Sequence, residues 1–274
     1  MACALTTLAH AKAWLGITND ASDANIERLI QSASRFILSY IGRQTVCVRQ
    51  YEELYDGNGK TWMLLKQWPI QSLQSIQIVG GPTITQLLAP GATGSGYKIN
   101  PLDTPEEGPQ RVTLMGYVFP YGKDSVFVTY TAGWKTEDTL TIVGVPTDTP
   151  TAGAILVSSL SATWAGDIEV LDGEIAMLKV ASNPAAGEYT VDALGNYGFN
   201  VADVGKSVTI VYSYVPADLE QAAYEMVGEA VRYQQRIGVK SKTLGGQETI
   251  VWDNNLFNDR AAAILQQYRR VAPI

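Results

Sequence analysis

The sequence predicts an α+β protein in which a bundle of four helices carries a small antiparallel β subdomain and an inserted all-β, sandwich-like domain. Three observations predict this fold class. Apolar residues recur with a helical period near both ends of the chain, the period changes to two from Tyr51, and a Pro-rich link at 144–153 separates two sets of period-two runs. We therefore expect a helical core at 1–50 and 215–274, a β subdomain at 51–134 and an inserted domain at 135–214.

Two helices are expected before the β region. Residues 6–16, TTLAHAKAWLG, begin with hydroxyl residues that cap a helix, and Gly16 ends it. From Asp23 to Ile41 the apolar residues form a stripe with a period of 3.6, and Gly42 supplies the stop. This second helix is the strongest helical pattern in the chain and should extend about 28 Å.

Two more helices are expected after the β region. One begins at Pro216, which is favourable in a first turn, and ends at Gly238. Its apolar face consists of Leu219, Ala222, Ala223, Met226, Val227 and Ala230. The last helix is predicted from about Asn258 to Arg270, which closes the bundle.

The region between the helices consists of period-two runs punctuated by Gly, Pro and Asn. The first set predicts a small antiparallel sheet from the runs TWMLLKQWPI, LQSIQIVGG, GYKINPL, RVTLMGYVFP and SVFVTYTAGW. The second set predicts strands at AILVSS, EIAMLKV, GEYTVDA, NYGFNV and SVTIVYSYVP. The last run of each set begins with Ser-Val and alternates around Tyr, as an insertion next to a terminal strand would leave.

Composition argues against several classes of protein. The chain has 274 residues, a net charge of −7 and a single histidine. An acidic balance argues against a groove that grips nucleic acid, and no apolar run approaches the roughly 18 residues that span a membrane. Cys3 and Cys47 form no CxxC pair, so the sequence suggests neither a disulfide framework nor a zinc site, which fits a reducing compartment.

Two stretches resemble binding motifs but depart from them. DGNGKT at 56–61 has no glycine five positions before Gly59 and is followed by strand-like residues, so a hairpin turn of the Asn-Gly type is expected instead of a phosphate loop. GDIEVLDGE at 166–174 brings carboxylates together, but its spacing differs from that of an EF-hand loop. Alternation of Ile168 and Val170 predicts strand, turn and strand there.

No arrangement of residues points to catalysis. His10 lies on a short helix among alanines, so a solvated or capping role is expected for it. A hydrolase would need Glu52 and Glu53, or Glu106 and Glu107, to converge in a cleft, yet adjacent residues on a strand point to opposite faces. We therefore expect a protein that is not an enzyme and holds neither a cofactor nor a metal.

The order of the segments resembles a known family. The stretches LTTLAHAKAWLGI, ANIERLIQSASRFILSYIGR, YDGNG, VTYTAGW, VPADLEQAAYEMVGEAVRYQQRIGVKSKTLGG and QQYRRV follow one another as in tailed-phage head-to-tail connectors, also called adaptors. The resemblance covers 1–134 and 207–272. Residues 135–206 depart from it and are similar to small β-sandwich modules of phage structural proteins.

The resemblance implies a structural virion protein of the phage neck, made in the host bacterial cytoplasm. Such connectors are helical bundles that form a ring of about twelve copies beneath the portal. The implied partners are the portal protein, neighbouring copies, a tail or stopper protein, and genome DNA that passes through the channel without sequence-specific binding. No membrane partner is implied.

The connection between the last two helices is too long for a simple turn. Within it, residues 239–253 (the arm) contain two glycines and the strand-like run QETIVW, which suits addition to the sheet edge of a partner. Its basic residues suit an acidic portal rim or the DNA backbone. The alternatives are a loop that folds back on its own bundle and a solvated basic patch. The expected partner-binding residues are Arg236, Lys240, Lys242, Gly245, Gly246, Thr249, Val251, Trp252, Tyr268, Arg269 and Arg270.

A second interpretation comes from another class of protein. The inserted domain would be a phage surface or tail β module that binds carbohydrate or capsid. The feature that favours it is a set of aromatic residues in that domain: Trp164, Tyr189, Tyr197 and Phe199. Aromatic residues of this kind belong more often to a core than to a binding surface.

Overall fold

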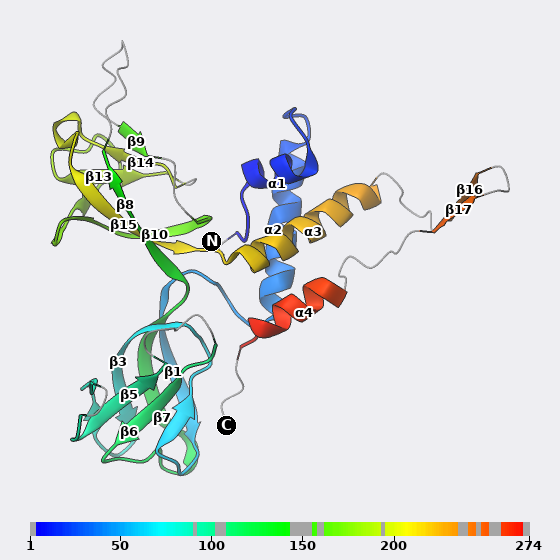
Figure 1. The fold of residues 1–274 in the computed structure, drawn as a ribbon. Helices are drawn as coiled ribbons and strands as arrows, with labels where there is room; N and C mark the ends of the chain where they lie inside the picture. Colours follow the sequence, from blue (N-terminus) through cyan, green and yellow to red (C-terminus); the bar gives the residue numbers. More distant parts are fainter. Residues whose placement is uncertain are drawn as a thin grey trace. The chain divides into compact units, whose positions relative to one another are not determined.

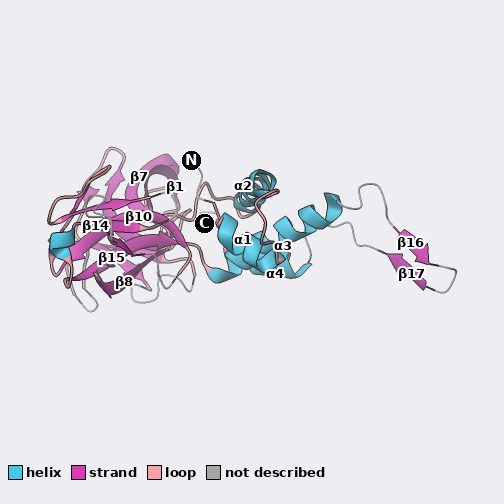
Figure 2. Cartoon of the chain, turned by 90° about the horizontal axis from the view of Figure 1, so that it is seen from above, coloured by secondary structure: helices cyan, strands magenta, loops and turns pink. Residues whose placement is uncertain are grey.

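The computed structural model describes residues 4–89, 92–101, 108–142, 155–157, 162–192, 195–234, 241–244, 248–251 and 259–270. The chain divides into two compact units. One is helical and consists of Met1–Gln44 and Val215–Arg269, and the other consists of Thr45–Tyr214 and Arg270–Ile274. The α+β class is confirmed, with four described helices and several antiparallel sheets. Figure 2 distinguishes the helices from the strands.

The four expected helices are all present, as α1 (Leu8–Leu15), α2 (Asp23–Tyr40), α3 (Ala217–Gln234) and α4 (Asp259–Gln267), shown in Figure 1. The caps that the sequence predicts for α1 form. The side chain of Thr7 accepts a hydrogen bond from the backbone N–H of His10, and Gly16 adopts a left-handed conformation with φ of 69°.

The helical unit is held together by the predicted apolar faces. Helix α3 contacts each of the other three helices, and α1 also contacts α2. The buried faces consist of Ile26, Ile30, Ala33, Ile37 and Leu38 on α2, and Leu219, Ala222, Ala223, Met226 and Val227 on α3. On α1 the ring of Trp14 stacks on that of Tyr224, with ring centroids 6.0 Å apart. This ring lies over Gly228, where an added Cβ would come within 2.4 Å of it.

The first β block, residues 49–132, contains two sheets where the sequence predicted one. Strands β1 (Arg49–Gly57), β7 (Gly122–Ala132), β3 (Ile70–Ile78) and β4 (Thr83–Ile84) form one sheet in the order β1-β7-β3-β4. Strands β2 (Trp62–Leu64), β6 (Arg111–Met115) and β5 (Gly96–Asn100) form the other in the order β2-β6-β5. Both sheets contribute to one apolar core, so two layers bury it. Strand β1 was not among the predicted runs.

The turn at 58–61 is not the expected hairpin. Asn58 does form a local turn, in which its side-chain oxygen accepts from the backbone N–H of Lys60 and its Nδ2 donates to the carbonyl of Trp62. However, β1 pairs with β7 and β2 pairs with β6, so the turn joins two sheets. A strand follows it, as the sequence predicted, whereas a phosphate loop would be followed by a helix.

The second β block, residues 135–214, also contains two four-stranded sheets. Strands β11 (Ile175–Ala176), β10 (Trp164–Asp172), β15 (Ser207–Tyr214) and β8 (Lys135–Thr141) form one in that order. Strands β12 (Leu178–Lys179), β13 (Glu188–Val191), β14 (Tyr197–Phe199) and β9 (Ile155–Val157) form the other. The predicted strand, turn and strand at 166–174 is confirmed by β10 and β11. A separate apolar core lies in this block.

Two further findings concern the sequence predictions. Cys47 is disulfide-bonded, so the expectation that the cysteines form no disulfide is wrong; Cys3, the only other cysteine of the chain, lies outside the described residues. Spacing in the sequence reveals metal motifs and frameworks of several cysteines, but it does not reveal a single disulfide. No helix in the described part of the chain is long and apolar enough to cross a membrane.

Candidate interaction surfaces

The arm contains a β-hairpin. Strands β16 (Ser241–Leu244) and β17 (Glu248–Val251) pair antiparallel, with Lys242 opposite Ile250 and Thr243 opposite Thr249. The strand expected in QETIVW therefore exists. Among the strands that the structure describes, β16 and β17 pair only with each other, so the hairpin forms a two-stranded sheet of its own. Arg236, Lys240, Gly245, Gly246 and Trp252 lie outside the described residues.

The residues expected to bind partners at the end of the chain differ in their surroundings. The backbone carbonyl of Tyr268 accepts a hydrogen bond of 2.7 Å from Nε of the buried Arg43, and its hydroxyl lies 3.5 Å from Oδ2 of Asp218. The guanidinium of Arg269 lies 5.9 Å from the ring centroid of Tyr40. Tyr268 thus joins α4 to the rest of the helical unit, whereas Arg269 and Arg270 are exposed.

His10 has a tertiary partner that the sequence did not indicate. Its Nδ1 lies 3.0 Å from Oε1 of Glu220, a carboxylate buried on α3. The hydroxyl of Thr6 donates to the same oxygen at 3.1 Å. Burial and the hydrogen bond to Glu220 raise the pKa of Tyr224 above its ordinary value, so a neutral tyrosine completes the cluster. This cluster joins the N-terminal segment to α3.

The aromatic residues on which a carbohydrate-binding module would depend belong to the core of the second β block. Tyr189, Tyr197 and Phe199 are buried, and Trp164 packs against them while its Nε1 donates to the hydroxyl of Tyr197 at 3.2 Å. The two tyrosine hydroxyls donate to Asp167, each at 3.0 Å. These four aromatic residues therefore pack within the second β block instead of forming a carbohydrate-binding surface.

Of the two candidate carboxylate pairs, the one that the structure describes, Glu52 and Glu53, does not converge in a site for acid and base. Glu52 is exposed, whereas Glu53 accepts hydrogen bonds from Tyr55 at 2.5 Å and Tyr130 at 2.7 Å. Glu106 and Glu107 lie outside the described residues. In the acidic stretch 166–174, Asp167 also contacts the ammonium of Lys179 at 2.8 Å. Glu53 and Asp167 thus link neighbouring segments through hydrogen bonds and, for Asp167, an ion pair.

One outward face of the first β block gathers cations around an aromatic ring. In the β2-β6-β5 sheet, Met63, Val112 and Leu114 point into the core. Because side chains alternate along a strand, Trp62 and Arg111 lie on the outer face. The ammonium of Lys60 lies 4.8 Å, and the guanidinium of Arg111 5.7 Å, from the ring centroid of Trp62.

A third cation belongs to the same face. Trp62 is opposite Thr113, which is opposite Lys98 on the far strand. The ammonium of Lys98 donates to the carbonyl of Ala92 at 3.2 Å. We call Lys60, Trp62, Lys98 and Arg111 the basic face. The sequence does not indicate this face, because its residues lie in separate parts of the chain and gather only when β2, β6 and β5 pair.

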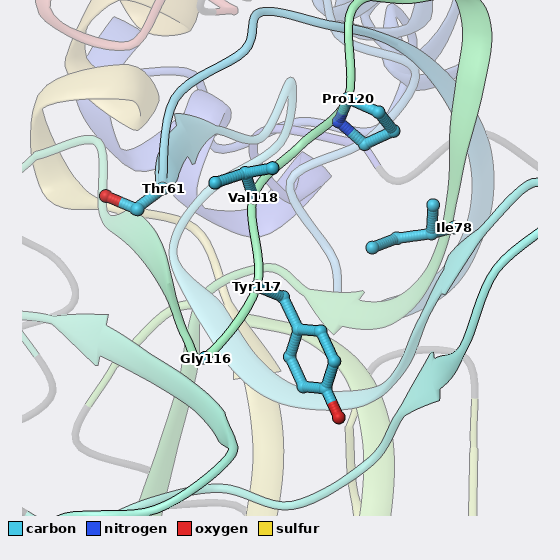
Figure 3. A pocket seen from close by; sticks show the side chains of 6 residues that line it. All are labelled: Thr61, Ile78, Gly116, Tyr117, Val118 and Pro120. Carbon is cyan, nitrogen blue, oxygen red and sulfur yellow. The ribbon is translucent and has the colours of Figure 1, made fainter.

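A pocket of about 550 Å³ opens near one end of this sheet and is lined by Thr61, Ile78, Gly116, Tyr117, Val118 and Pro120 (Figure 3). The loop that forms it is fixed by backbone hydrogen bonds. Gly59 donates to the carbonyl of Phe119 at 2.7 Å, and Phe119 donates to that of Lys60 at 2.9 Å. The lining is mainly apolar and contains no carboxylate or basic group, so it suits contact with an apolar group.

Comparison with known proteins identifies a family. The model described as Head completion protein matches residues 4–158, which is more than half of the chain. The matched stretch contains α1, α2 and the first β block, and it continues past residue 134 into the stretch expected to be inserted. A search of curated proteins finds no match.

Proposed function

The chain belongs to the head completion protein family of phage head-to-tail connectors, and on that premise we propose that it forms a ring beneath the portal and continues the DNA channel toward the tail. It is a structural protein of the phage head, found in the virion at the head-to-tail junction. In the proposal its partners are the portal protein, neighbouring copies in a ring of about twelve, and a tail or stopper protein. Genome DNA passes without sequence-specific contact, and the protein is made in the host bacterial cytoplasm.

The family match carries this proposal, and the helical unit supports it. Two helices from the start of the chain and two from its end form one helical unit, and the β region lies between them in the sequence. The hydrogen bond from Arg43 to the carbonyl of Tyr268 joins these two parts of the chain. Such a unit can keep its shape while other surfaces of the protein make contacts with partners.

The hairpin arm supports a role in attachment. A sheet of two strands leaves an edge on each strand, and such edges pair readily with a strand of another chain. An isolated two-stranded hairpin is at best marginally stable in water, so a partner strand would stabilise it. We therefore assign the arm to contact with the portal or a neighbouring copy, with its basic residues facing acidic groups.

Imaging of assembled particles tests the ring. Purified portal particles are mixed with the protein and examined by electron microscopy, alongside portal alone. We expect a closed ring of density below the portal, because identical head-to-tail interfaces close when the rotation per subunit fits. A single bound copy, or none under any assembly condition, would contradict the proposal.

A deletion tests the arm. Removing Ser241–Thr249 should leave the circular dichroism and the melting temperature of the isolated protein nearly unchanged, because β16 and β17 pair with no other described strand. The same deletion should weaken or abolish attachment to the portal. A control variant with the nine deleted residues in scrambled order separates strand pairing from loop length. If the shortened protein unfolds, or still assembles as the parent does, the arm is internal structure.

The second β block supports an insertion at 135–214. It has its own apolar core, and its first and last strands pair, with Lys135 opposite Ser213 and Thr141 opposite Ser207. The backbone N–H of Tyr214 donates to the carbonyl of Trp134 at 3.2 Å. The chain thus enters and leaves this block at neighbouring points, which is the geometry that tolerates insertion of a domain.

Excision tests the insertion. Joining Trp134 to Val215 through a short Gly/Ser linker should leave a connector whose helices still form and that still assembles on the portal. The block expressed alone should give the spectrum of a folded all-β protein. A disordered spectrum for the block, or loss of the helical fold after excision, would show that the two β blocks depend on each other.

A further inference from the structure

We propose that the basic face of the first β block contacts the phosphate backbone of duplex DNA. The inference deepens the proposed function, since it assigns a surface of the chain to the DNA that passes the head-to-tail junction. The basic face is a different part of the molecule from the arm. The sequence suggested the basic residues of the arm, not those of this face, for contact with an acidic portal rim or with DNA.

The first argument is the local charge. The strands WML, GYKIN and RVTLM that form the β2-β6-β5 sheet contain no Asp or Glu, although the chain as a whole has a net charge of −7. None of Lys60, Lys98 and Arg111 forms an ion pair with a carboxylate in the described part of the chain. These cations therefore remain available to an anionic ligand.

The second argument is the shape of the face. Neighbouring strands lie about 4.8 Å apart, so the register places Trp62 and Lys98 roughly 10 Å apart across the sheet. The cations are thus spread across the sheet, which suits an extended array of charges better than one small anion. The Trp62 indole has Lys60 and Arg111 beside it, and this contact orders two long side chains.

The third argument separates DNA from an acidic protein. Contact with phosphates needs cations and no deep apolar pocket, whereas a tight protein interface depends on an aromatic anchor filling a pocket. On this face the Trp62 ring is half-buried and flanked by cations, so it offers little free apolar area. The apolar pocket nearby is lined by other residues. A phosphate backbone therefore fits the face better.

A titration of the full-length, nitrogen-15-labelled protein with duplex DNA tests the inference. A duplex of about 20 base pairs is several times longer than the basic face is wide, so it can cover the whole face. The signal of the Trp62 indole N–H, assigned with the Trp62→Phe variant, reports on the face directly. With three phosphate contacts the logarithm of affinity should fall with that of salt with a slope of about −2.7, so a fivefold rise in salt should weaken binding about 80-fold.

Two variants with equal changes of charge decide between the surfaces. Replacing Lys60, Lys98 and Arg111 with Gln should abolish binding. Replacing Lys240 and Lys242 of the arm, together with Arg236 before it, with Gln should leave the slope unchanged. Arg111→Gln alone should reduce the magnitude of the slope by about 0.9, which keeps the test valid if the triple variant fails to fold.

Several results would overturn the inference. These are no binding at low salt, loss of binding in the arm variant but not in the basic-face variant, and equal or tighter binding of a polyglutamate peptide, which would indicate an acidic protein partner. A single-stranded oligonucleotide that binds more tightly than the duplex would also overturn it, because stacking on Trp62 would then dominate. Ring formation on the portal does not depend on any of these results, so it tests the proposed function separately.

Discussion

Replacement of Gly228 by Ala tests the packing of the helical unit, because two effects of opposite sign meet at this residue. In the interior of a helix, Ala is favoured over Gly by about 1 kcal/mol. Against this, the added Cβ would lie 2.4 Å from Cζ3 and 3.0 Å from Cη2 of Trp14, so the indole has to move.

The structure indicates which effect is larger. The ring of Trp14 is stacked on Tyr224 with an interplanar angle of 13°, so it cannot shift without losing that contact. Overpacking of this kind costs about 1–3 kcal/mol, less where a side chain can give way, and Trp14 is 41% exposed. We therefore expect Gly228→Ala to lower the free energy of unfolding by about 1 kcal/mol after the helix preference is subtracted.

The sign of the effect should reverse when the indole is removed. In a Trp14→Ala background there is no ring to meet the new methyl group, so Gly228→Ala should stabilise the protein by about 0.5–1 kcal/mol. The coupling energy between the two changes is then about 2 kcal/mol, well above the error of a double-mutant cycle.

Urea unfolding of the four proteins, followed by far-ultraviolet circular dichroism, measures this cycle. The linear dependence of unfolding free energy on urea gives each value, and unchanged slopes would show that the same surface is exposed on unfolding. If Gly228→Ala stabilises both backgrounds equally, the packing of Trp14 on α3 is not as the structure has it.

Three further predictions concern the β blocks. Gly133→Ala should lower the free energy of unfolding by about 2 kcal/mol or more, because φ of Gly133 is 139° and an added Cβ would lie 2.6 Å from backbone atoms of Cys47. Thermal unfolding measures this effect, and an unchanged melting temperature would contradict the prediction. Asp167→Ala should lower the free energy of unfolding by about 3 kcal/mol, because the hydroxyls of two buried tyrosines lose their acceptor. Asp167→Asn keeps an acceptor oxygen and should lower it less. Equal losses for the two variants in urea unfolding would refute the role of the acceptor. Burial raises the pKa of Tyr55 and Tyr130, so these tyrosines ionise at lower pH in the unfolded chain than in the folded protein. Their contribution to the free energy of unfolding should therefore be constant below about pH 10 and decrease above it. If the free energy of unfolding of a double Phe variant decreases equally steeply above that pH, these tyrosines are not the cause.

The sequence by itself determined the elements whose signals are local. A cap at Thr7, a stop at Gly16 and apolar residues at a period of 3.6 lie within one or two turns of each other, so the helices could be predicted close to their observed ends. Alternation likewise indicated the strand in the arm and several strands of the second β block, such as β15, but not β8. The order of these elements was enough to suggest the family that the family model identifies.

Which strands pair was decided by the tertiary structure alone. The turn at 58–61 has the sequence of a hairpin, yet β1 and β2 belong to different sheets, because β1 pairs with β7 and β2 pairs with β6, both far along the chain. Long-range pairing also separates β7 and β15, whose sequences resemble each other. Strand β7 lies between β1 and β3 in one sheet, and β15 lies between β10 and β8 in another.

The candidate surfaces depend on these long-range pairings. His10 has no acidic neighbour in sequence, but the packing of α1 on α3 brings Glu220 to it. Lys60, Lys98 and Arg111 are unremarkable in sequence and gather on one face only after three strands pair in one register. A one-residue shift in that register would turn alternate side chains to the opposite face, and no local pattern fixes the register across so many intervening residues. The apolar core that fixes it exists only in the folded chain.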